Sequence, residues 1–199
     1  MQPIDKLVIL GRDGILNTYR DDHVKSPDEW EPVPGALEAV ARLNHAGWHT
    51  VVATNQAGIG RGMIDMAAIN AIHAHMIHCL HQAGGRLDAV FFCPHTPEDE
   101  CDCRKPKPGL MLQIARRYGI ELQSVPMVCD TLRDLLAAQA AGCEPHLVRS
   151  GRAERLTADE LRAIVAQVPA TEVHRDLGAF AEFLLEREHV PTSGPGGLH

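Results

Sequence analysis

The sequence predicts an α/β fold with a parallel sheet and helices on both of its faces. Short apolar, β-branched runs alternate along the chain with longer stretches in which apolar residues recur at helical spacing. Runs that are apolar throughout suit strands that helices cover on both sides. Alternation of strand and helix implies right-handed crossovers between parallel strands, and therefore one open sheet.

Each element follows from its own stretch of sequence. Five strands are expected, at residues 6–10, 50–54, 89–93, 126–129 and 146–148. Six helices are expected around the apolar stripes at 37–43, 69–80, 110–118, 132–139, 161–165 and 177–184. Gly47 and Gly84 stop the first two helices. Residues 1–187 are thus predicted to form a single Rossmann-like domain without a large cap domain, and the Gly/Pro-rich tail at 188–199 is expected to be disordered.

Composition excludes several classes of protein. The 45% hydrophobic and 23% charged content is ordinary for a soluble globular domain. A net charge of -7 argues against nucleic acid as a partner, because phosphate backbones attract clustered positive charge. No apolar run reaches the roughly 20 residues of a membrane span, and the start resembles no signal peptide. We therefore expect a cytoplasmic monomer whose six cysteines are not a disulfide framework.

Polar segments follow the predicted strands. They cover residues 11–17 after the first strand, 54–62 after the second, 103–109 between the third and fourth, and 130–134 after the fourth. In open parallel sheets, ligands bind beyond the carboxyl ends of the strands. We therefore expect these four segments to converge on one site.

The side chains in these segments suit a phosphate site. The residues concerned are Asp13, Thr54, Asn55, Arg104, Lys105 and Asp130. Two carboxylates with water suit a hard cation such as Mg²⁺. A hydroxyl, an amide and Gly-rich backbone N–H groups suit phosphoryl oxygens, and the two cations add positive charge. Each residue alone could be a helix cap or a turn former, but placement at four strand ends together favours an anion site.

The order and spacing of these segments resemble the haloacid dehalogenase superfamily of phosphotransferases. Within it, the chain resembles the D-glycero-D-manno-heptose 1,7-bisphosphate phosphatases and their kin, the histidinol-phosphate phosphatases. The resemblance runs from about residue 6 to 149 and includes KSPDEW, ATNQAGIGRG, FFCPH, CDCRKPKPG and AAGCEPHLV. It implies a Mg²⁺-dependent phosphomonoester hydrolase whose partner is a small phosphorylated sugar.

The resemblance also implies a role for each motif position. The implied roles are proton donation by Asp13, phosphoryl stabilisation by Thr54 and Lys105, substrate binding by Asn55, Gln56, Arg104 and Thr131, and Mg²⁺ binding by Asp13 and Asp130. The segment from Tyr19 to Asp22 overlies a substrate-contacting loop of the family without clearly matching its residues.

A separate cluster predicts a zinc-bound loop at residues 93–103. Cys93, His95, Cys101 and Cys103 supply the three thiolates and one imidazole of a closed tetrahedral zinc site. The alternative is a surface loop with free thiols, which would be vulnerable to oxidation. The resemblance implies a structural zinc here that braces the residues following the loop. Cysteines and histidines outside this loop are not expected to bind metal. Cys79 and Cys143 are expected in the core, and solvated or core-edge helix positions are expected for His73, His75, His78 and His81.

Position 11 departs from the family pattern. Gly11 stands where the family has the aspartate that attacks phosphorus, and Cys129 stands where it has a glycine. Loss of a nucleophile typically costs roughly 10⁴ to 10⁶ in rate. We expect Cys129 to fill part of the vacated volume rather than to act as a nucleophile. Two functions stay open: a phosphatase of the heptose-bisphosphate or histidinol-phosphate type, and a catalytically impaired phosphosugar-binding protein. A polynucleotide end phosphatase is disfavoured by the acidic charge.

Overall fold

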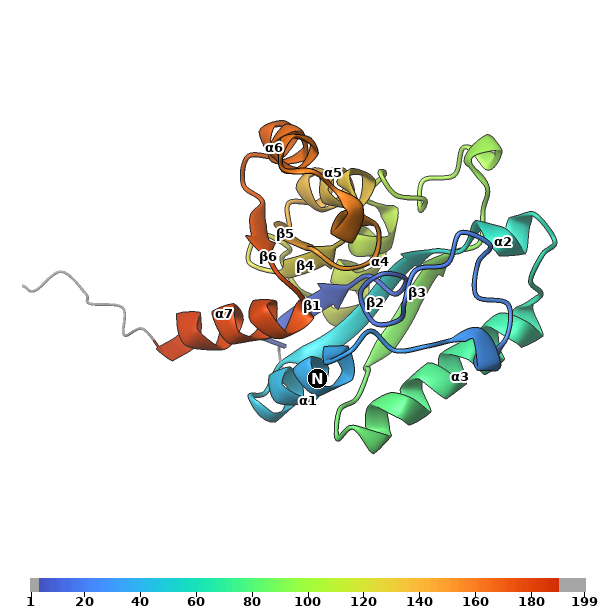
Figure 1. Ribbon diagram of the computed structural model, residues 1–199, viewed down its shortest axis with the longest axis horizontal. Helices are drawn as coiled ribbons and strands as arrows, with labels where there is room; N and C mark the ends of the chain where they lie inside the picture. Colours follow the sequence, from blue (N-terminus) through green and yellow to red (C-terminus); the bar gives the residue numbers. More distant parts are fainter. Residues whose placement is uncertain (1–3, 190–199) are drawn as a thin grey trace, which may run out of the picture.

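The protein is built on one six-stranded parallel sheet (Figure 1). The computed structural model describes residues 4–189, in which the strand order is β3-β2-β1-β4-β5-β6 and all neighbours are parallel. The strands are β1 (Leu7–Leu10), β2 (His49–Asn55), β3 (Ala89–Cys93), β4 (Pro126–Cys129), β5 (Glu144–Val148) and β6 (Glu172–His174). The predicted fold class is confirmed. β6, a short edge strand, was not predicted.

The predicted helices are present. They are α1 (Ala36–His45), α3 (Met66–Gln82), α4 (Gly109–Tyr118), α5 (Leu132–Ala141), α6 (Ala158–Gln167) and α7 (Leu177–His189). Short elements without a predicted counterpart are α2 (Ala57–Gly60) and the 3-10 helices η1 (Pro27–Glu29), η2 (Pro97–Asp99) and η3 (Gly151–Arg155). α7 extends two residues past the expected boundary at 187, and the rest of the predicted tail lies outside the described residues. Within residues 4–189, no helix combines the length and apolar composition that crossing a membrane requires.

Two separate hydrophobic cores hold the helices against the sheet. On one face, α1, α3 and α7 pack through residues such as Val40, Ile72 and Phe180. On the other face, α4 and α5 pack through residues such as Ile114 and Leu135, and α6 packs against the same cluster. Figure 1 shows these two helical layers on opposite sides of the strands. The apolar stripes in the sequence are therefore core packing.

The strand order reverses direction between β1 and β4. The chain passes outward from β1 to β2 and β3, and then returns to place β4 on the other side of β1. Loops that leave the carboxyl ends of β1 and β4 therefore separate at this point, where open α/β sheets place their ligands. The segments after these two strands begin at Gly11 and Asp130.

A pair of buried histidines lies at the β5–β6 edge of the sheet. His146 Nδ1 and His174 Nε2 are 3.0 Å apart, and both rings pack against Phe180. Burial and the neighbouring His174 lower the pKa of His146 to about 3, and burial lowers the pKa of His174. Both rings are therefore neutral in the folded protein at neutral pH.

We expect the folded protein to lose stability in mild acid because of this pair. An unfolded histidine titrates near pH 6.5, so below that pH the unfolded chain binds protons that the folded chain does not. The free energy of unfolding is therefore unaffected by titration of this pair above about pH 6.5. Below that pH it falls by about 1.4 kcal/mol per pH unit for each such histidine. His146→Phe should make this decline shallower in urea unfolding between about pH 6 and pH 5, whereas the exposed His78→Gln should not. Equal slopes in the parent and His146→Phe would contradict the assignment.

Candidate active site and metal centre

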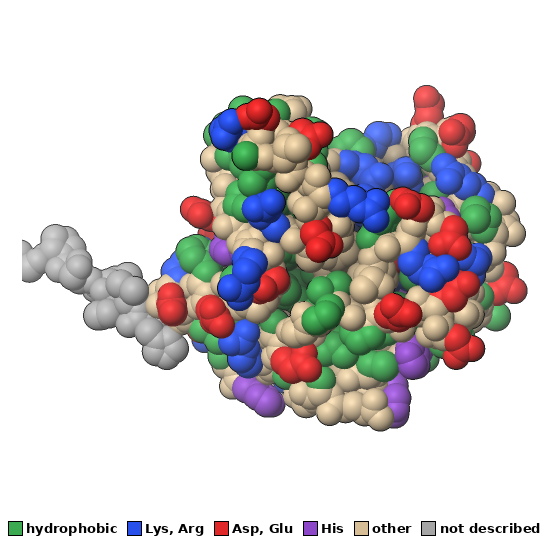
Figure 2. Space-filling model, in the orientation of Figure 1, with side chains coloured by type: hydrophobic (Ala, Val, Ile, Leu, Met, Phe, Trp, Pro, Cys, Tyr) green, Lys and Arg blue, Asp and Glu red, His purple; other side chains and the backbone are tan. Residues whose placement is uncertain are grey.

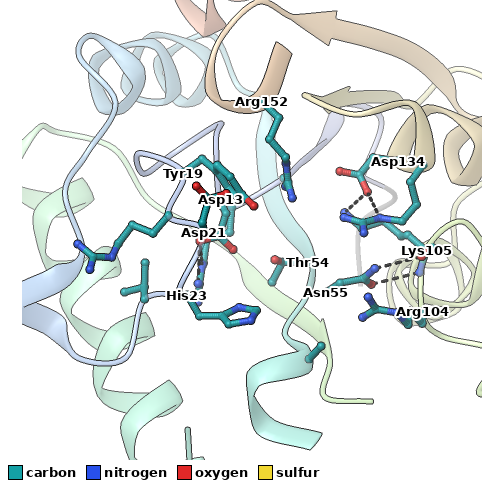
Figure 3. Close-up of a pocket in the computed structure, with 16 residues that line it drawn as sticks. Asp13, Tyr19, Asp21, His23, Thr54, Asn55, Arg104, Lys105, Asp134 and Arg152 are labelled. Carbon is teal, nitrogen blue, oxygen red and sulfur yellow. Dashed lines mark hydrogen bonds and ion pairs between the residues drawn. The ribbon is translucent and has the colours of Figure 1, made fainter. Parts of the chain in front are cut away.

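A cavity lies at the carboxyl ends of the strands, where the predicted segments converge (Figure 3). The predicted residues that line it are Asp13, Thr54, Asn55, Arg104 and Lys105, together with Gly11. Its cationic side chains are Arg12, Arg20, Arg104, Lys105, Arg133 and Arg152, against the carboxylates of Asp13, Asp21 and Asp134. Figure 2 shows Lys and Arg side chains gathered on the surface between α5 and α2. Six cations against three carboxylates make this an anion pocket in a chain of negative net charge.

Asp13 is held in one orientation by three donors. Its Oδ1 accepts from Arg12 Nη2 at 2.8 Å and from Asn17 Nδ2 at 3.0 Å, and its Oδ2 accepts from Gln56 Nε2 at 2.9 Å. Burial acts to raise the pKa of Asp13, but the Arg12 charge and these hydrogen bonds outweigh it and lower the pKa. The carboxylate therefore faces the cavity in a fixed position.

Arg12 is itself positioned by a histidine of α3. The Arg12 side chain is 1% exposed, and its Nη1 lies 3.3 Å from His73 Nε2. Burial and the adjacent Arg12 lower the pKa of His73 to about 4, so the ring is neutral and its Nε2 can accept from the guanidinium. The expectation of a solvated or core-edge His73 is wrong: its side chain is buried behind the cavity.

Lys105 is fixed to β2 and to α5. Asn55 donates from Nδ2 to the Lys105 carbonyl and accepts from the Lys105 N–H at Oδ1, both at 3.1 Å. The Lys105 ammonium donates to the Ala53 carbonyl at 3.0 Å and pairs with the buried Asp134 at 3.2 Å. Burial acts to raise the pKa of Asp134, but Lys105 and the nearby arginines lower it. Asp134, in the first turn of α5, was not predicted as a site residue.

Asp130 directly follows β4 and pairs with Arg152 of η3, the short helix after β5. Its Oδ2 accepts from the Arg152 backbone N–H at 3.0 Å and from Arg152 Nε at 3.3 Å. Burial raises the pKa of Asp130, and the Arg152 charge opposes this shift. The guanidinium also lies over the Tyr19 ring, 4.3 Å from its centroid (Figure 3). Arg152 was not predicted, although it follows β5 just as the predicted residues follow other strands.

Two residues with expected substrate-binding roles, Gln56 and Thr131, do not line the cavity. Gln56 is 1% exposed and donates to both Asp13 and Thr54, at 2.9 and 3.0 Å. Thr131 is the N-cap of α5, where its hydroxyl accepts from the Asp134 N–H at 3.2 Å. Neither is among the residues that line the cavity. Their observed contacts are those of a positioning residue and a helix cap.

Gly11 leaves the cavity without a side chain next to Asp13. Its N–H donates to the Val128 carbonyl at 3.1 Å, and a Cβ at this position would lie 2.9 Å from Ile15 Cγ1. Cys129 does not fill that space, because it packs in the core on the α4 and α5 face of the sheet. Burial also raises the pKa of Cys129, so its thiol stays protonated.

The predicted zinc ligands converge at the end of β3. Ligand atoms of Cys93, His95, Cys101 and Cys103 all lie within 4.8 Å of one another. The Sγ–Sγ distances are 3.6 Å from Cys93 to Cys101 and 3.5 Å from Cys101 to Cys103, and His95 Nδ1 lies 3.6 and 3.3 Å from the Cys93 and Cys103 sulfurs. Tetrahedral zinc with the usual bond lengths separates its sulfurs by about 3.8 Å. The donor set and its spacing therefore fit a zinc ion.

Comparisons with known proteins identify the family. Residues 102–180 match the HAD-hydrolase-like family model. The D-glycero-beta-D-manno-heptose-1,7-bisphosphate 7-phosphatase of Bordetella bronchiseptica is 51% identical over 182 residues, which are 91% of this chain and 98% of the relative. The chain belongs to this phosphatase family. The family member of the same name from Pseudomonas aeruginosa is 44% identical over 180 residues, which are 90% of this chain and 98% of the relative.

Solved structures of the heptose-bisphosphate phosphatase family share the fold. The crystal structure of the D,D-heptose 1,7-bisphosphate phosphatase from B. bronchiseptica, complexed with magnesium and phosphate, has a TM-score of 0.84 and 51% identity and covers 92% of this chain and 99% of its own. The corresponding enzyme from Burkholderia thailandensis has a TM-score of 0.70 and 46% identity, with 91% and 99% covered. The superfamily and the family indicated by the sequence motifs are therefore confirmed.

Proposed function

We propose that this chain binds D-glycero-beta-D-manno-heptose 1,7-bisphosphate and hydrolyses its 7-phosphate slowly. The observation that carries the proposal is the cationic cavity that Thr54, Asn55 and Lys105 line together with a fixed Asp13 carboxylate. Oriented cations and hydroxyl donors stabilise the charge that develops on a phosphoryl group during transfer. The names of the 51% and 44% identical relatives support the choice of substrate.

We assign a role to each residue in the cavity. Thr54 and Lys105 stabilise the phosphoryl oxygens, Lys105 from a position fixed by Asn55. Arg104 and Asn55 bind the substrate, and Asp13 donates the proton to the leaving oxygen. Of the other two expected substrate-binding residues, Gln56 orients Asp13 and Thr131 caps α5 beside Lys105's partner.

The residues available for magnesium are few. Magnesium, when bound, neutralises charge on the phosphoryl oxygens. It requires near-octahedral oxygen coordination, for which this chain offers the Asp130 carboxylate and the Asp13 main chain. The Asp130 carboxylate already accepts two hydrogen bonds from Arg152, and Gly11 supplies no ligand. We therefore propose weak magnesium binding by Asp13 and Asp130.

We further propose that Cys93, His95, Cys101 and Cys103 hold a structural zinc ion. Four protein ligands leave no open coordination position, so the zinc would brace the loop rather than take part in chemistry. The loop leads directly into Arg104, whose Nη1 donates to the His95 carbonyl at 3.2 Å. The metal would therefore stabilise the position of the cations on that side of the cavity.

A second candidate function follows from Gly11 alone. Without a nucleophilic side chain, only water can attack phosphorus, and the remaining rate comes from positioning and electrostatics. If that rate is negligible, the same pocket makes the chain a phosphosugar-binding protein. In either case, we predict that residues 1–187 form a single domain and that the protein is a monomer. Sedimentation equilibrium would check the monomeric state.

We expect inorganic phosphate to raise the Tm of the parent protein and Lys105→Met to abolish this shift. The substitution keeps the aliphatic stem and removes the charge that meets the phosphoryl group. Lys107→Met is the matched control, because Lys107 is exposed two residues further on and lies outside the cavity. A phosphate-induced shift that persists in Lys105→Met would place the anion site elsewhere.

Turnover separates the two candidate functions. Phosphate release from the heptose bisphosphate should be slow but measurable in the parent, lower in Asp13→Asn, and higher than release from histidinol phosphate. Binding of the heptose bisphosphate without any release above the Asp13→Asn level would favour the phosphosugar-binding protein. No binding of the heptose bisphosphate would refute the proposed substrate.

A further inference from the structure

Arg152 engages one oxygen, Oδ2, of the Asp130 carboxylate that should be the principal metal ligand. Asp130 has a side chain that is 1% exposed, and its Oδ2 accepts from both the backbone N–H and Nε of Arg152. A guanidinium so placed satisfies the buried negative charge at short range. Arg152 therefore supplies a counter-charge to Asp130 from within the chain.

The surrounding backbone holds this ion pair in place. A Cβ added at Gly14 or at Gly151 would collide with Asp130 Oδ2, so both loops approach the carboxylate as closely as glycine permits. Both glycines have positive φ, 82° and 57°, which glycine adopts without strain. The Ser150 hydroxyl donates to the Gly14 carbonyl at 2.6 Å and ties the two loops together. Asp130 Oδ2 is thus enclosed by the segment that carries Arg152.

The carboxylate oxygens of Asp13 are engaged as well. Both oxygens of Asp13 accept from Arg12, Asn17 or Gln56, and position 11 has no side chain. A divalent ion at Asp130 would also meet the positive charge of Arg152. The cavity nevertheless has three more cationic than acidic side chains among the residues that line it, so its attraction for anions does not depend on an added metal.

Part of the Arg152 guanidinium remains available to a ligand. Nε is used by Asp130, and among residues 4–189 no hydrogen bond from either Nη group to another residue is present. The side chain extends toward Tyr19 at the cavity, and the Tyr19 ring supports its face (Figure 3). An arginine with two free Nη groups can bind two oxygens of a phosphate at once.

We propose that Arg152 replaces the divalent metal as the counter-ion of Asp130, and that the cavity binds phosphate monoester dianions without Mg²⁺. The ligand's phosphoryl oxygens are met by the Arg152 Nη groups on one side and by Thr54 and Lys105 on the other. The identity of the sugar rests on the proposed function, whereas the metal-independent binding of the phosphoryl group does not.

Calorimetric titration with inorganic phosphate tests this inference. Zinc-loaded protein, dialysed free of magnesium, should bind phosphate with an affinity that changes by less than about twofold when MgCl₂ is added. Arg152→Gln removes the charge and should weaken phosphate binding by at least about tenfold, and the residual binding should then improve with Mg²⁺. Arg155→Gln is the matched control, because Arg155 lies in the same 3-10 helix, is exposed and does not line the cavity. This variant should bind phosphate with the affinity of the parent.

A second variant, Arg152→Lys, keeps the test valid if Arg152→Gln does not fold. Arg152→Gln leaves the buried Asp130 without a charged partner, so its far-ultraviolet circular dichroism and Tm are recorded first. Arg152→Lys keeps the charge but loses the two Nη groups, and should bind phosphate more weakly than the parent while staying insensitive to Mg²⁺. Phosphate binding only when Mg²⁺ is present, or unchanged affinity in both Arg152 variants, would overturn the inference. Metal-independent phosphate binding together with no binding of the heptose bisphosphate would refute the proposed substrate alone.

Discussion

Cys101→Ser is expected to release zinc and to lower the Tm by about 5–10 °C, which corresponds to about 2–3 kcal/mol in a chain of this size. Zinc holds Cys93, His95, Cys101 and Cys103 together through four bonds, and a serine oxygen is a poor replacement for a thiolate. The parent should contain about one zinc per chain by elemental analysis. The variant should contain much less.

Cys79→Ser provides the matched control for this variant. Cys79 lies on α3, half-buried and outside the four-residue cluster. Its substitution should leave the zinc content unchanged. Any loss of zinc in Cys101→Ser can then be attributed to the four-residue cluster. A well-folded parent without zinc, or a Cys101→Ser variant that retains full zinc content, would refute the metal centre.

Loss of zinc should also weaken the anion pocket. The zinc loop continues into Arg104, whose guanidinium donates to the His95 carbonyl, and then into Lys105, whose backbone pairs with Asn55. A loosened loop leaves these cations less ordered, so more conformational entropy is lost when a ligand binds. Phosphate affinity in Cys101→Ser should therefore fall, whereas Cys79→Ser should match the parent.

The sequence predicts the fold well because its strands are buried on both faces. The runs at 6–10 and 126–129 correspond to β1 and β4, whose residues are all buried, since a continuous apolar run between polar turns leaves little ambiguity. β6 was not predicted for the opposite reason. It is a three-residue edge strand, mostly exposed, whose pairing with β5 depends on tertiary contacts rather than on its own pattern.

The site was predictable wherever a strand end supplied the residue. Asp13, Thr54 and Asn55 line the cavity because they lie at or just after the carboxyl ends of β1 and β2. Contacts between segments distant in sequence were not predictable. Arg12 meets His73 across 61 positions, and Asp130 meets Arg152 across 22. No local pattern encodes these pairs, because each depends on how a helix or a loop packs over the sheet.

We expect Gly11→Asp to raise phosphatase activity at least about a hundredfold, a gain of about 2.7 kcal/mol in transition-state stabilisation. The new carboxylate can attack phosphorus as the ester oxygen leaves with a proton from Asp13, and water then hydrolyses the acyl phosphate. The backbone at position 11 has no positive φ, so it accepts an aspartate. The measurement is phosphate release from the heptose bisphosphate. Gly11→Asp combined with Asp13→Asn should lose the gain, since no acid would protonate the leaving oxygen.

Ile15 is the neighbour that a side chain at position 11 must displace. The added Cβ would lie 2.9 Å from Ile15 Cγ1, whereas no atom of Cys129 is among its three nearest contacts. Gly11→Asp combined with Ile15→Ala, which removes Cγ1, should therefore recover activity if the single variant is strained. Parent turnover at ordinary enzyme rates, roughly 1–10³ per second, would show that this chain does not need a carboxylate there.

The magnesium dependence of the restored variant connects position 11 with Arg152. The introduced carboxylate supplies the metal ligand that the parent lacks, but Arg152 still competes for Asp130. Activity of Gly11→Asp should therefore require Mg²⁺, and adding Arg152→Gln should lower the Mg²⁺ concentration that gives half of the maximal rate. A restored rate that is indifferent to Mg²⁺ would show that the carboxylate acts only as a nucleophile. No gain in Gly11→Asp, with or without Ile15→Ala, would show that the site has diverged from phosphate transfer and would leave binding as its function.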